Sequence, residues 1–73
     1  MLRVRVVPRG KLAANSRLSA DGLDVALQDG MRVRDLLVEL GLFDEEVRRV
    51  VVNGRRGRLD QTLRRNDMVE LFS

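Results

Sequence analysis

The chain contains no cysteine, histidine, tryptophan or tyrosine, and its 73 residues include one proline and two phenylalanines. Without cysteine it can form no disulfide, thiolate nucleophile or cysteine-ligated metal site. Without histidine it lacks the side chain that titrates near neutral pH and the commonest transition-metal ligand. General acid–base catalysis usually recruits a group whose pKa lies near the working pH. The sequence therefore predicts a protein that is not an enzyme and has no catalytic residue, cofactor or metal ion.

Long hydrophobic runs are also missing. No apolar run exceeds three residues, and Arg3 and Arg5 interrupt the first apolar segment. A membrane span or a secretory leader needs a much longer uninterrupted run. We therefore expect a cytoplasmic protein that does not bind a membrane.

What the chain does contain suits a small globular fold. Hydrophobic residues make up 44% of it and charged residues 34%, which is enough apolar surface to offset chain entropy. A chain of this length buries only about 60% of the surface that its unfolded form exposes. We expect one domain spanning residues 1–73, with a net stability of about 3–5 kcal/mol.

The charges are unevenly distributed along the chain. The formal net charge is +3 and thirteen of the fourteen basic residues are arginine, but residues 21–47 carry a net charge of −6 and residues 48–73 a net charge of +4. A basic face would form if the two basic ends lay side by side. A solvated, arginine-rich surface without a ligand is the alternative, and it is the favoured one.

Hydrophobic periodicity predicts a strand, a second strand and then a helix. Leu2–Val6 and Leu23–Gln28 alternate apolar and polar residues, as half-buried strands do; Pro8 ends the first strand and Lys11–Ala20 is a loop. From Val33 to Leu40 the apolar spacing changes to that of one helix face. Arg32 falls at the N-cap, where it offers no acceptor, and Gly41 suits the left-handed residue that ends a helix.

Three further strands are predicted in the second half. Leu42 and Phe43 form an apolar pair expected to close the core, and 49–52 reads as a strand followed by Asn53-Gly54, a strong hairpin signal. The returning strand, 55–59, is weak because Gly57 interrupts it. A helical turn over 60–63 and a tight turn over 64–67, with Asn66 in the left-handed conformation, lead to the last strand, 68–72.

Three segments of the second half resemble a known family. MRVRDLLVELGL resembles the helix of the ThiS/MoaD sulfur-carrier proteins, VVVNGRRGRLDQTL is similar to their hairpin segment, and RRNDMVELF to their last strand. The resemblance covers Met31 to Phe72. It implies an α+β, ubiquitin-like β-grasp fold, with a mixed four- to five-stranded sheet, one main helix packed on one face, and the first and last strands parallel at the centre.

The resemblance also implies a function and a partner. Such proteins dock on an adenylating or cofactor-assembly enzyme in sulfur transfer, thiamine synthesis or molybdenum/tungsten cofactor assembly. Members that carry sulfur end in a flexible Gly-Gly tail, whereas this sequence ends at Phe72-Ser73. We therefore expect protein docking rather than carrier chemistry. A structural subunit that completes a larger partner is a further alternative.

The implied sheet topology places an apolar patch with an arginine rim on the outward face, and apolar residues and arginine are enriched at protein interfaces. A small patch, partly covered by the loop of residues 8–20, is the alternative. The predicted partner-binding residues are Val7, Arg49, Val51, Met68 and Phe72.

A second candidate site is an arginine cluster that would contact phosphate or RNA, as in the related TGS domains. Guanidinium groups suit phosphates, but the chain has almost no aromatic platform for bases, so solvated hairpin tips are favoured and nucleic acid is the less expected partner. Asp44-Glu45-Glu46 makes a poor cation site and is expected to be a solvated turn. The cluster comprises Arg55, Arg56, Arg58, Arg64 and Arg65.

Overall fold

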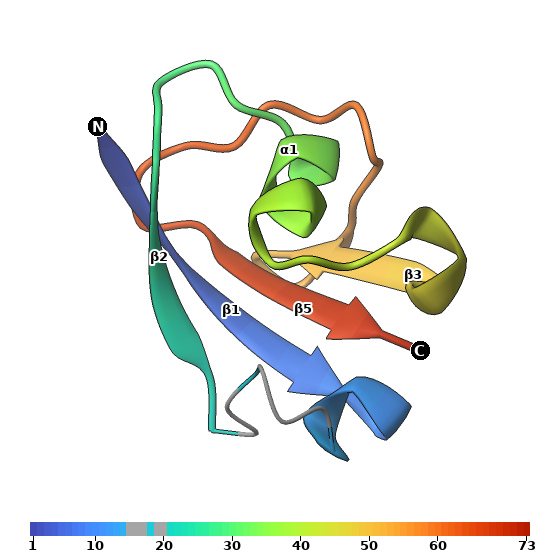
Figure 1. Cartoon of the computed structure of the whole chain (residues 1–73). Helices are drawn as coiled ribbons and strands as arrows, with labels where there is room; N and C mark the ends of the chain where they lie inside the picture. Colours follow the sequence, from blue (N-terminus) through green and yellow to red (C-terminus); the bar gives the residue numbers. More distant parts are fainter. Residues whose placement is uncertain (15–17, 19–20) are drawn as a thin grey trace.

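The computed structural model describes residues 1–14, 18 and 21–73. A five-stranded sheet has the order β2-β1-β5-β3-β4, and one α-helix crosses one of its faces (Figure 1). The central strands β1 and β5 are parallel, whereas β1–β2, β3–β5 and β3–β4 are antiparallel. This confirms the predicted mixed sheet with parallel first and last strands at its centre. The elements are β1 (Leu2–Arg9), β2 (Leu23–Leu27), α1 (Val33–Glu39), β3 (Arg49–Val52), β4 (Arg55–Arg56) and β5 (Met68–Phe72).

Strand β1 is longer than the sequence predicted, because it continues through Pro8 to Arg9. The Arg5 N–H donates to the Asp67 carbonyl on the β5 side, so the alternation along a strand turns the position of Pro8 toward the β2 side. The pairing of β1 with β2 ends at Val6. An N–H group at position 8 would therefore have no partner on a neighbouring strand, and proline is tolerated at such positions of a strand.

A short 3₁₀ helix, Gly10–Ala14, follows β1. It takes up the start of the predicted loop Lys11–Ala20, of which residues 15–17, 19 and 20 lie outside the described residues.

The helix α1 begins at the predicted place without an acceptor on its N-cap residue, Arg32. The Asp35 carboxylate instead accepts a hydrogen bond from the Arg32 N–H at 2.8 Å, which is half of a capping box. The next two N–H groups of the helix donate to the carbonyls of Gln61 and Leu59, at 3.0 and 2.9 Å. A distant loop therefore satisfies the orphan donors that a helix start leaves.

The end of α1 confirms the predicted role of Gly41. Its φ is +73°, its N–H donates to the Val38 carbonyl at 3.0 Å, and the Leu42 N–H donates to the Leu37 carbonyl at 2.9 Å. These two bonds define a Schellman motif. The motif turns Leu42 into the core, where it is buried.

Phe43 is not a core residue, and this prediction was wrong. Its side chain is 70% exposed. The Schellman motif uses Leu42 as its apolar contact, so the chain is already leaving the core at the next residue. Phe43 then caps a second 3₁₀ helix, Asp44–Glu46, through a hydrogen bond from its N–H to the Glu46 carboxylate at 3.2 Å.

The segment after β4 departs from prediction in two ways. Strand β4 covers only two residues instead of 55–59, and residues 60–63 form no helical turn. Thr62 forms an antiparallel bridge with Arg32, and the Leu63 N–H donates to the Met31 carbonyl at 2.9 Å. The chain leaves the sheet after Gly57 because its backbone supplies hydrogen bonds to the segment that starts α1.

The core lies between the sheet and α1. Its fully buried side chains come from the inward positions of the strands and from one face of the helix; the largest include Leu27, Leu36, Leu37, Leu63, Leu71, Val4, Val6, Val33 and Val69. The predicted inward faces of the first and last strands and of the helix are confirmed. Within the described residues, no helix is long and apolar enough to cross a membrane.

Candidate functional site

The candidate site is the face of the sheet opposite α1, called here the outer face. Register places the alternate residues of β1, β5 and β3 on it in rows: Arg5 beside Met68, Val7 beside Glu70 and Val51, and Arg9 beside Phe72 and Arg49. Apart from Val7, the buried residues of these alternating rows, such as Val6, Val50 and Val69, point to the core side. The outer face therefore combines apolar and arginine side chains, as the sequence predicted. It comprises Arg3, Arg5, Val7, Arg9, Asp24, Ala26, Arg49, Val51, Arg56, Met68, Glu70 and Phe72.

Arg49 and Phe72 form the best-defined contact of the outer face. They are cross-strand partners on β3 and β5, and the Arg49 Cζ lies 4.4 Å from the centroid of the Phe72 ring. This is cation–π geometry. It holds an aromatic ring and a guanidinium together at one end of the sheet, and the guanidinium has no ion-pair partner among residues 1–14, 18 and 21–73. Arginine and large aromatic residues are common at the energetic centres of protein interfaces.

Two other arginines of the outer face are engaged by carboxylates. Arg9 donates from Nε to the Glu70 Oε2 at 3.1 Å and its Nη2 lies 3.1 Å from the same oxygen. Arg5 lies 3.4 Å from the Asp24 carboxylate. Arg9 was missed from the sequence because Pro8 was taken as the end of the strand; the alternation from Arg3 and Arg5 was the signal that would have included it.

The apolar patch is smaller than predicted because Val7 is only 9% exposed. Val7 lies on the outer face by register, but its side chain offers little surface to a partner. Met68 is 39% exposed, and Val51 and Phe72 are half-buried. The accessible patch therefore consists of Met68, Val51 and Phe72 with Arg49 at its border.

The structure brings together part of the predicted arginine cluster. Arg55, Arg56 and Arg64 line one open hollow of about 840 Å³, and Arg56 and Arg58 line a second of about 440 Å³. Arg65 is exposed on the turn that follows Leu63 and lines neither hollow.

A buried polar link joins the two turns beside these hollows. The Asp67 side chain is part of a residue that is only 8% exposed; its Oδ1 accepts from the Asn53 Nδ2 and its Oδ2 from the Arg64 N–H, both at 2.8 Å. The Met68 N–H donates to the Asn53 Oδ1 at 2.8 Å. The sequence predicts Asn53 only as a hairpin residue, and its pairing with Asp67 is seen only in the structure.

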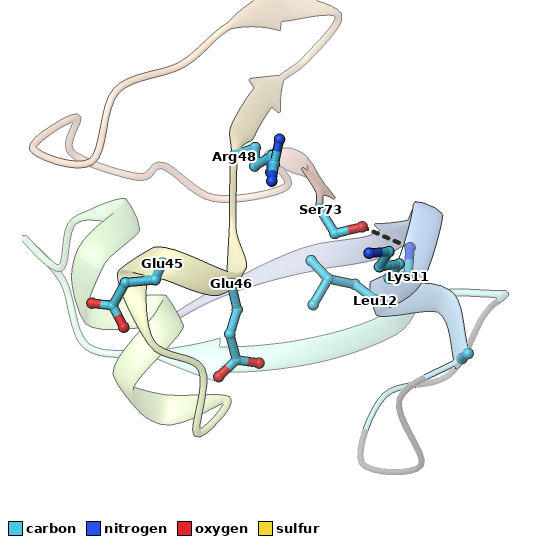
Figure 2. A pocket seen from close by; sticks show the side chains of 7 residues that line it. Lys11, Leu12, Glu45, Glu46, Arg48 and Ser73 are labelled. Atoms are coloured by element: carbon cyan, nitrogen blue, oxygen red, sulfur yellow. Dashed lines mark hydrogen bonds between the residues drawn. The ribbon is translucent and has the colours of Figure 1, made fainter.

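A third hollow, of about 610 Å³, lies beside Ser73 (Figure 2). The Lys11 N–H donates to the Ser73 hydroxyl oxygen at 2.6 Å, and the other charged residues around it, Glu45, Glu46 and Arg48, differ in sign. No basic side chain is hydrogen-bonded to the Ser73 hydroxyl within the described contacts. The described residues also contain no group of three or more carboxylates that could hold a metal ion.

Several solved structures have a similar fold. A protein from Pyrococcus furiosus described as a candidate molybdopterin converting factor, subunit 1, superposes with a TM-score of 0.80 at 28% identity, covering 99% of this chain and 97% of that one. Two structures of small archaeal modifier protein 1 from Haloferax volcanii superpose with TM-scores of 0.79 and 0.75. Their identities are 18% and 19%, covering 99% and 96% of this chain and 97% and 92% of theirs.

The chain has the ubiquitin-like β-grasp fold. The predicted fold class and the predicted likeness to MoaD-type proteins are therefore confirmed. No protein-family model and no curated protein sequence matches this β-grasp protein. Structural similarity thus extends over nearly the whole chain, although most of the sequence differs.

Proposed function

We propose that this β-grasp protein is a non-enzymatic docking module that binds an adenylating or cofactor-assembly enzyme of sulfur transfer through its outer face. The observation that carries the proposal is the Arg49–Phe72 pair, which shares with Val51 and Met68 a face that the helix leaves open. The likeness to a converting-factor subunit, 28% identical over nearly the whole chain, supports the partner class.

The charges of the outer face define the partner's surface. Arg5 and Arg9 are paired with Asp24 and Glu70, whereas Arg3 and Arg49 lie at opposite ends of the face without a carboxylate within 4.0 Å among the described residues. A complementary surface would carry an apolar centre that meets Phe72 and Met68, and carboxylates at its rim. Electrostatic complementarity of this kind sets register and association rate more than affinity.

Titration calorimetry with purified adenylating and cofactor-assembly enzymes tests the proposal. Phe72→Ala and Arg49→Gln should each weaken binding by about 30-fold or more, because interface hot spots begin at about 2 kcal/mol. Val38→Ala is the matched control, because Val38 is 75% exposed on the helix, away from the outer face. Wild-type affinity in both outer-face variants, or an equal loss in the control, would contradict the proposal.

A separate experiment asks whether the bound protein also carries sulfur. The partner enzyme, ATP and a sulfide donor are added, and the protein is weighed by mass spectrometry. Adenylation of a carboxyl terminus releases pyrophosphate, and attack by sulfide then releases AMP and leaves a thiocarboxylate in which one oxygen is replaced by sulfur. That mass change would extend the docking role to carrier chemistry, and binding without it would limit the role to docking.

A further inference from the structure

The edge of the sheet at β4 carries a concentration of positive charge outside the accessible patch of Met68, Val51, Phe72 and Arg49, although Arg56 belongs to the outer face. Arg55, Arg56 and Arg64 line the larger hollow described above, and Arg56 and Arg58 line the smaller one. Arg56 therefore lines both hollows. In all, four of the described arginines line these two hollows, which have Arg56 in common.

The lining of the larger hollow is held in place by the hydrogen-bonded link between the two turns. The Asp67 carboxylate ties the Asn53 side chain to the Arg64 backbone, so Arg64 is fixed opposite the hairpin that carries Arg55. Asn53 and Gly54 adopt φ values of +53° and +81°, as a tight two-residue hairpin requires. This turn fixes the position of β4, which consists of Arg55 and Arg56. The site is preorganised by hydrogen bonds that do not involve the guanidinium groups.

The charge of the larger hollow is strongly positive. Asp67 is the only acidic residue among those that line it, and both of its carboxylate oxygens already accept hydrogen bonds within the fold. The hydroxyl of Thr62 and the amide of Gln61 also line it and can donate to an oxygen anion. The lining therefore offers several hydrogen-bond donors to an anion, and its one carboxylate is already hydrogen-bonded within the fold.

The backbone adds a donor at the same edge. The Gly57 N–H donates to the Val50 carbonyl at 2.8 Å, so antiparallel alternation directs the Arg56 N–H away from β3. Strand β4 is the last of the sheet, and this N–H faces its open edge. A ligand lying along β4 would meet both the guanidinium and the amide of Arg56.

We propose that this edge binds a chain of linked phosphates, either inorganic polyphosphate or the backbone of a single-stranded nucleic acid. Guanidinium forks match phosphate oxygens, and two adjoining hollows that share Arg56 fit consecutive phosphates better than a single one. The lining residues include no aromatic side chain, and single-strand binders that grip bases rely on stacking platforms. Recognition is therefore of phosphates and is independent of base identity.

Fluorescence anisotropy with the full chain tests the proposal, using a labelled mixed-sequence RNA oligonucleotide and unlabelled inorganic polyphosphate as competitor. Four phosphate contacts would give a slope of about −2.8 for log K against log salt, so affinity should fall about 50-fold between 50 and 200 mM salt. The triple variant Arg55→Gln/Arg56→Gln/Arg64→Gln should lose most of the affinity and flatten the slope to about −0.7. The Arg64 backbone N–H survives this substitution, so the Asp67 link and the fold are kept, which circular dichroism verifies.

The control is a triple variant with the same change of charge at exposed positions that line neither hollow, Arg3→Gln/Lys11→Gln/Arg34→Gln. It should keep the affinity within about twofold if binding is local to β4. Displacement of the oligonucleotide by polyphosphate at equal phosphate concentration identifies polyphosphate as the ligand class, and retention of the oligonucleotide identifies nucleic acid. Equal losses in the two triple variants, unchanged binding in the β4 variant, or no binding by wild-type protein at 50 mM salt would overturn the proposal.

Discussion

Replacing Asp67 by asparagine removes one acceptor from the link between the two turns while keeping the shape of the side chain. Asp67 accepts from the Asn53 amide with one oxygen and from the Arg64 N–H with the other, both at 2.8 Å. An asparagine has only one side-chain oxygen. Whichever way its amide is turned, its NH₂ group faces one of these two donors, so one of the two part-buried hydrogen bonds is lost.

The expected loss of stability is about 2 kcal/mol, because a hydrogen bond to a charged group contributes about 1.5–3 kcal/mol. This is a large part of the 3–5 kcal/mol expected for a domain of this size. The midpoint of thermal unfolding should fall by about 8–16 °C. Far-UV circular dichroism is the suitable measurement, since the chain has no tryptophan or tyrosine for intrinsic fluorescence.

The matched control is Asp60→Asn, an exposed carboxylate in the neighbouring loop, which should change stability by less than about 0.5 kcal/mol. A double-mutant cycle adds Asn53→Gly, which keeps the positive φ of that position. With the Asn53 amide gone, the oxygen of an asparagine at position 67 can turn to the Arg64 N–H. The double variant should then be more stable than the sum of the single changes predicts. Additive losses, or an Asp67→Asn variant as stable as wild type, would refute this account of the link.

Two glycine substitutions test the backbone of the fold, each followed by urea unfolding. Gly57→Ala should cost about 1–3 kcal/mol, because a Cβ there would lie 2.9 Å from the Val52 Cγ2; combining it with Val52→Ala should recover part of the loss, and a neutral Gly57→Ala would show that the hairpin gives way freely. Gly41→Ala should cost about 1 kcal/mol because of the φ of +73°, and Gly41→Asn less, since asparagine tolerates that conformation. Equal losses for the two Gly41 variants would point to a cause other than backbone conformation.

Local pattern in the sequence was enough for most elements. The alternation in Leu2–Val6 and Met68–Phe72, the helical spacing from Val33 and the Gly41 stop each depend on neighbouring residues alone, and each was confirmed. Asn53-Gly54 predicted the hairpin because positive φ is a property of the residues themselves. The resemblance to MoaD-type proteins supplied the strand order, which no local pattern contains.

The error at 60–63 arose because the deciding partner lay far away in the chain, whereas the error at Phe43 had a local cause. Residues 60–63 have helical-turn composition, but their backbone groups bond to the segment that starts α1. Phe43 is apolar, but the Schellman motif had already placed Leu42 in the available core position. Val7 lies on the outer face by register but is only 9% exposed, which agrees with the alternative of a small patch that the sequence left open.

By itself the sequence determined the elements, the inward faces and the absence of histidine and cysteine chemistry, because these follow from residue types and their spacing. Only the tertiary structure decided how Arg32 could begin a helix, that Asp67 joins two turns, and which arginines gather along β4. Each of these depends on groups separated by many residues along the chain, whose distances are set when the sheet closes around β1 and β5.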